Sequence, residues 1–118
     1  MINKDVFDLY EGLDEITRNK EIKFSAKTSY CLAFNKKILE PYYQTILDIR
    51  GKLFEKYGEV TNEGWKVPNE NIPAFSKEWQ EFTEVDNSIN IKQINIQDIS
   101  DAKIDVDLMI KLLPIIIE

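Results

Sequence analysis

Four aspartates lie close together near the C-terminal end of the chain: Asp98, Asp101, Asp105 and Asp107. Clustered carboxylate oxygens are the ligands that calcium and magnesium ions bind in proteins. The spacing matches no calcium-binding loop, because the segment has no glycine at the turn position and no closing glutamate. Acids near a helix start and ordinary surface charge explain these residues better. We therefore expect no metal site in this segment.

Lysines interleaved with aromatic residues form the only basic stretch of the chain. The lysines are Lys20, Lys23, Lys27, Lys36 and Lys37, and the aromatic residues among them are Phe24, Tyr30 and Phe34. Such a stretch can bind single-stranded nucleic acid, by charge and by stacking of bases on the rings. The simpler interpretation, which we favour, places the rings in the core and the lysines on solvated faces at two helix ends. We keep the five lysines as a candidate interaction surface.

Groups suited to catalysis are few. The chain has no histidine, which is the commonest general base and the commonest ligand of transition metals. Its four glycines are scattered, so they form no glycine-rich phosphate loop. Asp14 with Glu15, and Glu84 with Asp86, are carboxylate pairs in positions where exposed charge is expected, and glycoside chemistry by two carboxylates needs a cleft. We predict that the protein is not an enzyme and binds no cofactor.

The acidic excess lies entirely in the second half of the chain. Residues 1–60 carry ten acidic and ten basic side chains, whereas residues 61–118 carry eleven acidic side chains and five lysines, which gives the net charge of −6. Because an acidic chain repels the phosphate backbone, the composition argues against a nucleic-acid partner.

The totals fit one soluble domain, residues 1–118. No apolar run reaches the roughly 20 residues of a membrane span, and the start of the chain lacks the basic and apolar regions of a signal peptide. We therefore predict a cytoplasmic protein with no membrane partner. Cys31 is the only cysteine, and its place in an aromatic stretch favours a buried thiol over a reactive one.

These residues must be positioned by a long helix that the spacing predicts over 26–57. Apolar residues recur at steps of three and four: Cys31, Phe34, Ile38, Tyr42, Ile46, Ile49, Leu53 and Tyr57. Leu39, Tyr43, Leu47 and Phe54 widen this stripe. Pro41 falls on the polar side, where water can solvate the carbonyl that a proline leaves unpaired at a cost of about 3 kcal/mol. We predict a bend at Pro41; the alternative is two helices, with Pro41 at the first position of the second.

A first helix over residues 4–19 should lie antiparallel to the long one. Its apolar face carries Val6, Leu9, Leu13 and Ile16. Asn3 is the expected cap of the first helix and Ser25 of the second. Because the link between the helices is short, the pair should form a helical hairpin.

After Gly58 the helical pattern ends, and the sequence predicts a β-hairpin followed by a third helix. Val60 and residues 65–67 flank Asn62-Glu63-Gly64, which has the composition of a tight β-hairpin loop. Pro68 ends the second strand. A third helix should then begin at Asn69 or Asn71, with Pro73 in its first turn. Its core-facing residues are expected to be Ile72, Phe75, Trp79 and Phe82.

Residues 87–96 read as a strand that joins the hairpin. Ile89 and Ile91 would point to one side of a regular strand, and Ile94 and Ile96 to the other side. We therefore expect a bulge or a break at Lys92 and Gln93. Residues 98–113 read as helical turns, with Leu108, Met109, Leu112 and Leu113 along one side. The apolar C-terminal residues Ile115, Ile116 and Ile117 must be covered, by the domain itself or by a second copy.

Several segments carry a family resemblance. They are residues 23–37, Leu39-Glu40-Pro41, residues 56–59 and residues 85–99. In these segments and their order the chain resembles a family of short proteins that tailed phages and prophages of Gram-positive bacteria encode, most of them without a known function. Members often end in a short apolar helix and acids, as residues 108–118 do here. The resemblance implies no catalytic residue.

We predict an α+β fold: a long bent helix in an antiparallel helical hairpin, a small antiparallel β element and two shorter helices. The leading hypothesis for function is a non-enzymatic phage or prophage accessory protein that binds another protein, and that can form a homodimer through its aromatic or C-terminal isoleucine surface. One alternative is a phage inhibitor of a host defence or replication enzyme, with the acids of residues 78–107 on one face to imitate nucleic acid. Another is an accessory protein that binds single-stranded nucleic acid through the lysines.

Overall fold

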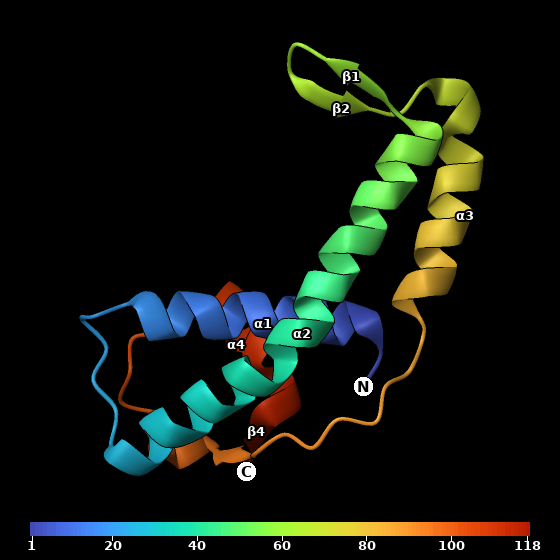
Figure 1. The fold of residues 1–118 in the computed structure, drawn as a ribbon. Coiled ribbons are helices and arrows are strands. Elements are labelled where there is room, and N and C mark those ends of the chain that lie inside the picture. The colour runs from blue at the N-terminus through green and yellow to red at the C-terminus, as the bar shows by residue number, and fades with distance from the viewer.

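The fold is organised around α2, a single helix that runs from Ala26 to Tyr57. In the computed structural model, which covers residues 1–118, this helix changes direction near its middle (Figure 1). Pro41 lies inside the helix and is exposed to solvent. The Oγ of Ser25 accepts a hydrogen bond from the Thr28 N–H at 3.2 Å and so caps the N-terminus. The predictions of one bent helix and of a Ser25 cap are confirmed.

Helix α1 (Asn3–Arg18) lies antiparallel to the first half of α2, as predicted, and the two form a helical hairpin (Figure 1). Helix α4 (Val106–Leu112) packs against α1. The core is made where these three helices meet three isoleucines of the C-terminal quarter of the chain. Its members are Val6, Leu9, Leu13, Ile16, Leu32, Leu39, Ile46, Ile94, Ile99, Leu108, Leu112 and Ile115.

The predicted cap of α1 is wrong. Ile2 stands at the N-cap position, and no side chain caps the helix. Asn3 is instead buried, and its Nδ2 donates a hydrogen bond to the Phe82 carbonyl at 2.9 Å while its Oδ1 accepts one from Asn87 Nδ2 at 2.7 Å. The side chain is therefore used to join the start of α1 to the end of α3 (Ile72–Thr83), which lies far away in the sequence.

The buried side of α2 coincides with the predicted stripe at Leu39, Ile46 and Leu53 and departs from it elsewhere. The residues of α2 that are buried are Thr28, Leu32, Asn35, Leu39, Ile46 and Leu53. Phe34, Ile38 and Cys31 are half-buried at the edge of this line, and Tyr42 is exposed. The apolar pattern misplaced the line because two of its members, Thr28 and Asn35, are polar residues that are hydrogen-bonded inside the protein.

The second half of α2 forms an arm together with α3 and a β-hairpin (Figure 1). The hairpin pairs β1 (Glu59–Thr61) with β2 (Gly64–Lys66) in antiparallel register, as predicted. Gly64 has a φ of +107°, a conformation that favours glycine in this turn. The Phe54 ring of α2 lies 5.3 Å from Phe75 of α3 and 6.3 Å from Trp65 of β2, so aromatic contacts hold the arm together.

Helix α3 differs from the prediction in its cap and in its burial. The turn Asn69–Asn71 is a 3-10 helix that precedes α3. Asn71 occupies the N-cap position, but its Nδ2 donates to the carbonyl of Tyr57 at the end of α2, at 2.9 Å. No residue of α3 is fully buried, although α2 and the start of α1 both contact this helix. Ile72, which was predicted to face the core, is exposed.

The predicted strand over residues 87–96 is wrong in its partner and its length. Residues 87–93 form no regular strand, and β3 covers only Ile94–Asn95, directly after the predicted break. It pairs in parallel with β4 (Ile116–Ile117) and does not touch the hairpin. Asn35 gives the physical reason: its side-chain amide makes two hydrogen bonds to the Lys92 backbone, in the place of a neighbouring strand.

The helical structure predicted over residues 98–113 is interrupted between Asp98 and Val106. Ile96–Asp98 is a 3-10 helix, and α4 begins only at Val106, after Asp105, whose Oδ1 accepts a hydrogen bond from the Leu108 N–H at 2.8 Å. A third 3-10 helix, Leu113–Ile115, follows α4. Leu113 was predicted to share the buried side of this helix, but it is exposed.

Candidate interaction surface

The Tyr30 cluster, which we define as Tyr30, Phe34 and Lys92, is the most distinctive group of side chains on the surface. The two rings lie one turn apart on α2, with centroids separated by 5.9 Å. The Nζ of Lys92 lies 4.8 Å from the Phe34 centroid and 5.8 Å from the Tyr30 centroid, in the range of cation–π attraction. Tyr30 is 60% exposed. An exposed aromatic ring and a cation are thus held side by side on an outer helix face.

The position of Lys92 is fixed from inside the protein. The Nδ2 of Asn35 donates to the Lys92 carbonyl and its Oδ1 accepts from the Lys92 N–H, each at 2.7 Å. Asn35 itself is fully buried. The backbone of Lys92 is therefore anchored to α2 directly beside the two rings that its side chain covers.

The five predicted lysines do not form one surface. Lys36 is used inside the chain, since its Nζ lies 2.9 Å from Asp14 Oδ1, which also accepts a hydrogen bond from Arg18 Nε at 3.0 Å. The hydrogen bond from Lys36, and the nearby charges of Lys36 and Arg18, hold the pKa of the Asp14 carboxyl below its usual value. This contact joins α2 to α1.

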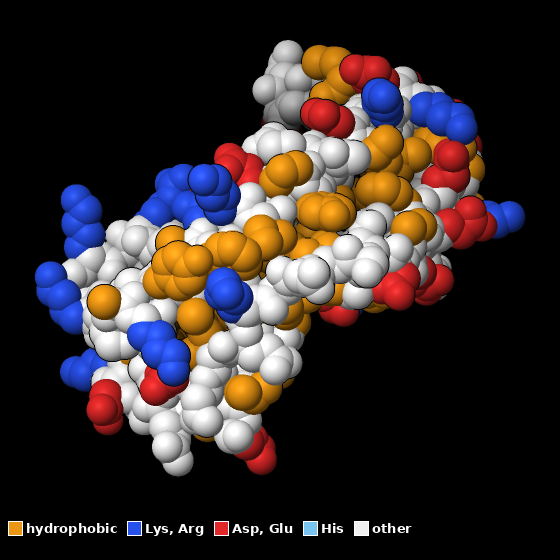
Figure 2. Space-filling view, turned by 60° about the horizontal axis from the view of Figure 1, so that its bottom comes forward, with side chains coloured by type: hydrophobic (Ala, Val, Ile, Leu, Met, Phe, Trp, Pro, Cys, Tyr) orange, Lys and Arg blue, Asp and Glu red, His pale blue; other side chains and the backbone are white.

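The other four lysines are exposed: Lys20, Lys23, Lys27 and Lys37. Lys27 lies three residues before Tyr30 and Lys37 three residues after Phe34, which puts both on the same side of α2 as the rings. On the face shown in Figure 2, basic side chains gather at one end of the molecule beside hydrophobic ones. The positions of Lys27 and Lys37 on α2, together with Lys92, make the surface around the Tyr30 cluster basic.

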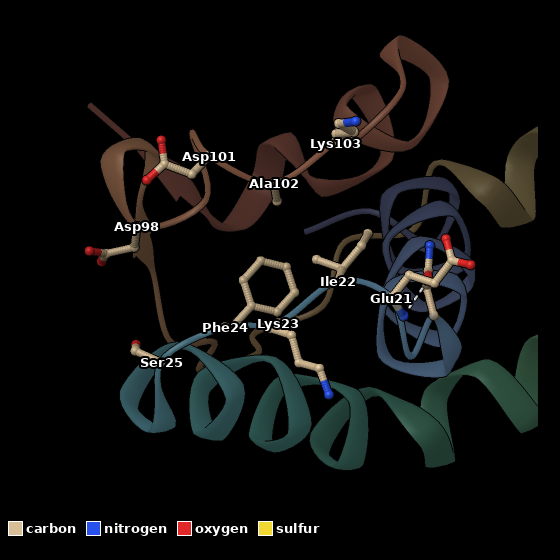
Figure 3. Close-up of a pocket in the computed structure, with 10 residues that line it drawn as sticks. Glu21, Ile22, Lys23, Phe24, Ser25, Asp98, Asp101, Ala102 and Lys103 are labelled. Carbon is tan, nitrogen blue, oxygen red and sulfur yellow. Dashed lines mark hydrogen bonds between the residues drawn. The ribbon is translucent and has the colours of Figure 1, made fainter.

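The remaining two lysines belong to the connection between α1 and α2. Lys23 lines a hollow of about 610 Å³ between this connection and residues 98–103, together with Asp98, Asp101 and Lys103. In Figure 3 the Phe24 ring lies between the two segments, and the carboxylates of the two aspartates point away from it. Lysine and aspartate side chains thus line this hollow together, around the Phe24 ring. Nowhere in the protein do three acidic or thiol side chains lie close enough together to hold a metal ion.

The predicted isoleucines at the C-terminal end divide between core and surface. Ile115 is fully buried, so the domain itself covers it, and it cannot contribute to an exposed surface. Ile116 is half-buried and Ile117 is exposed. Apolar surface is nevertheless abundant: eleven large hydrophobic residues are exposed, against thirteen hydrophobic residues in the buried core.

The acids of residues 78–107 lie in two separate groups. Glu78, Glu81 and Glu84 belong to α3 and its end, in the arm, whereas the four aspartates of residues 98–107 belong to the body of the molecule (Figure 1). Asp86, between the two groups, is paired with the amino group of Met1. Glu78 is also paired with Lys56 at 3.1 Å. These acids therefore do not form one face.

Sequence reasoning identified Tyr30 and Phe34 but missed Lys92, which comes from a segment 57 residues beyond Asn35. Two features of the sequence could have indicated the position of Lys92. One was the change of phase at Lys92 in the alternating isoleucines, and the other was a lone asparagine within the apolar pattern of the long helix.

No helix of the protein has the length and apolar character needed to cross a membrane. Comparison with protein-family models, with curated proteins and with solved structures found no match to this chain.

Proposed function

We propose that this protein is a non-enzymatic accessory protein that acts by binding another protein through the Tyr30 cluster. The observation that carries the proposal is an exposed tyrosine ring that is held beside a second ring and a lysine ammonium group. Tyrosine is enriched among the residues that dominate the binding energy of protein interfaces. A ring that is already held in place loses little conformational entropy on binding.

The surroundings of the rings define the chemistry of the partner. Lys27, Lys37 and Lys92 form no ion pair within the chain. A partner that places carboxylates around a central apolar side chain would complement both the charges and the rings. The resemblance of residues 23–37 and 85–99 to tailed-phage proteins supports a phage or prophage role, with a partner in the cytoplasm of the host.

A second candidate function is binding of single-stranded nucleic acid at the same surface. Lysines beside an exposed ring favour it, because phosphate charge and base stacking are the two contributions such binding needs. The ammonium group of Lys92, however, occupies one face of the Phe34 ring, where a base would stack. We therefore rank this function below protein binding. The separation of the acidic groups leaves little support for nucleic-acid mimicry.

The test is affinity capture from a bacterial host extract, followed by titration of the captured protein against purified variants. Tyr30→Ala and Lys92→Ala should each weaken binding, the first by at least about tenfold, as expected for an interface hot spot. Tyr42→Ala is the matched control, because Tyr42 is an exposed tyrosine of the same helix outside the Tyr30 cluster. Equal affinity of the wild type and both cluster variants would contradict the proposal.

Fluorescence anisotropy with single-stranded DNA and RNA separates the two candidates. Binding that weakens steeply with salt and requires Tyr30 would favour the nucleic-acid function. Absence of binding at low salt would remove it.

A further inference from the structure

The arm holds almost none of the buried core. It covers residues 47–83, from the second half of α2 through the hairpin to the end of α3. Leu53 is the one buried residue in this range, and it does not belong to the core cluster. The aromatic rings of the arm contact one another but stay partly exposed, and Val60, Trp65 and Ile72 are 74%, 46% and 43% exposed. The arm therefore owes little of its stability to burial.

The arm also projects from the body, by which we mean residues 1–46 and 84–118 (Figure 1). The Cα radius of gyration is 16.8 Å, whereas a compact domain of this length has one of about 13.5 Å. Every member of the core cluster lies in the body, and Ile46 is the last of them along α2. Gly51 follows soon after in the same helix, and glycine weakens a helix relative to alanine. The helix is thus least supported where it enters the arm.

The junction between the arm and the body is small and loosely packed. Trp79 and Phe82 of α3 pack against the core cluster. Two open hollows of about 410 and 390 Å³ lie at this junction, and Asn3 and Ile46 line both of them. Hydrogen bonds complete the junction, from Asn3 Nδ2 to the Phe82 carbonyl and from Asn87 Nδ2 to Asn3 Oδ1. Few apolar contacts are therefore lost when the arm leaves the body.

An arm that has left the body cannot stay folded by itself. It is shorter than the about 40 residues below which chains usually need disulfides, metals or association to fold. The body, in contrast, keeps the whole core cluster without the arm. Regions with few buried apolar contacts open at a lower free energy than the core, often as contiguous units. Separation of the arm and loss of its folded structure therefore occur together.

We propose that the arm separates from the body at Asn3 and unfolds as one unit, reversibly, while the body stays folded. In the open state the Trp79 and Phe82 side chains leave the core, and the hydrogen bond from Asn3 to the Phe82 carbonyl is broken. The opening uncovers Phe7 and Ile46 of the body, which line the hollow beside Trp79. Such a transition between order and disorder is a common element of conformational switches. The inference does not depend on the proposed function, because the Tyr30 cluster lies in the body.

Hydrogen exchange followed by NMR at low urea concentrations measures this opening residue by residue. After correction for intrinsic rates, we expect the amides of α3 and of the second half of α2 to exchange at least about tenfold faster than the slowest amides of α1. Their rates should rise together with urea, along a shallower slope than those of α1, because the opening exposes less surface. Arm amides as slow as those of α1 would overturn the proposal, and so would arm amides with unrelated urea dependences.

Two variants distinguish partial opening from global unfolding. Ile16→Val shortens a buried side chain of the body, which is folded in both the closed and the open state. The slowest α1 amides should exchange about two- to tenfold faster in this variant, whereas the arm amides should exchange as in the wild type. Faster exchange of the arm amides in Ile16→Val would mean that arm and body open together, which would overturn the proposal.

Leu53→Ala removes the buried side chain of the arm, which loses its contacts both in the open state and in the unfolded state. The arm amides should therefore exchange at least about tenfold faster. Complete loss of their protection, with α1 still protected, would also support the proposal. Arm amides that are unchanged in Leu53→Ala would contradict it.

Asn87→Ala tests the polar part of the junction. The change removes the hydrogen bond to Asn3, so the arm amides should exchange about fivefold faster. Asn90→Ala is the matched control, because Asn90 is an exposed asparagine of the same segment whose side chain makes no hydrogen bond within the protein. Equal rates in the two variants would overturn the proposal that the arm separates at Asn3.

The same variants separate this inference from the proposed function. Leu53→Ala should bind the captured protein as the wild type does, because the Tyr30 cluster stays in the folded body. Tyr30→Ala should leave the exchange of the arm amides unchanged. Faster exchange of these amides in Tyr30→Ala would show that arm and body do not open independently, and would overturn the inference.

Discussion

Replacing Asn35 by leucine tests whether one buried amide takes the place of a missing strand. Leucine has a similar size, so the change leaves little cavity, but it removes both hydrogen bonds to the Lys92 backbone. The N–H and C=O of Lys92 then have no partner within the protein. Because Lys92 is itself exposed, water can reach these groups in part, and the loss should fall at the lower end of the range for unsatisfied groups, about 1 kcal/mol for each.

The expected destabilisation of Asn35→Leu is thus about 2 kcal/mol, a large fraction of the 5–15 kcal/mol that folded domains possess. For a chain of 118 residues this corresponds to a melting temperature lower by about 8 °C. Urea denaturation gives the free energy of unfolding, and hydrogen exchange of the Lys92 amide reports the local effect. The amide should exchange with solvent far faster in the variant than in the wild type.

Asn90→Leu is the matched control, because Asn90 is an exposed asparagine of the same extended segment, and its side chain makes no hydrogen bond within the protein. Its stability should stay within about 0.5 kcal/mol of the wild type. If Asn35→Leu were equally stable and its Lys92 amide equally protected, the two amide hydrogen bonds would not be what holds this segment, and the reasoning would be refuted.

Two further predictions concern helix packing and pH. Gly12→Ala should lower the free energy of unfolding by about 1–3 kcal/mol in urea denaturation, because the new Cβ would lie 2.9 Å from the Lys111 Cβ and force α1 away from α4. Gly51→Ala should instead raise it by about 1 kcal/mol, since that Cβ meets nothing within 4 Å and alanine favours the helix; equal effects of the two changes would contradict the close approach at Gly12. The lowered pKa of Asp14 means that its contact with Lys36 stabilises the fold above the ordinary aspartate pKa of about 4, and that this contribution is lost as the pH falls through the lowered value. Asp14→Asn should remove this part of the pH dependence, at most about 1 kcal/mol for a partly exposed pair, and an unchanged pH profile of Asp14→Asn would exclude it.

The sequence alone predicted the elements whose signals are local. The bounds of α2 follow from its apolar period, from Ser25 before it and from Gly58 after it, all within a few residues of the helix they define. The hairpin follows from the Asn62-Glu63-Gly64 turn in the same way. Local signals also placed Tyr30 and Phe34, which are two of the three residues of the Tyr30 cluster, on one helix.

The sequence could not predict the contacts between distant segments. Nothing near Ile94 in the chain indicates that its partner is Ile116, and the alternating isoleucines fit pairing with the hairpin equally well. Asn3 illustrates a second limit: an asparagine at a helix start is typical of a cap, but here its side chain reaches the carbonyl of Phe82. Lys92 was missed for the same reason, because its neighbours belong to α2.

The extended segment between α3 and β3 shows how polar side chains can position backbone without a sheet. At its start, the Nδ2 of Asn87 donates to Asn3 Oδ1. At its other end, Asn35 makes both hydrogen bonds to Lys92. Each contact satisfies polar groups that would otherwise be costly to bury, and each fixes one end of the segment to a helix. The Lys92 ammonium group is consequently held over Tyr30 and Phe34 by the fold itself, so the candidate surface is organised before any partner binds.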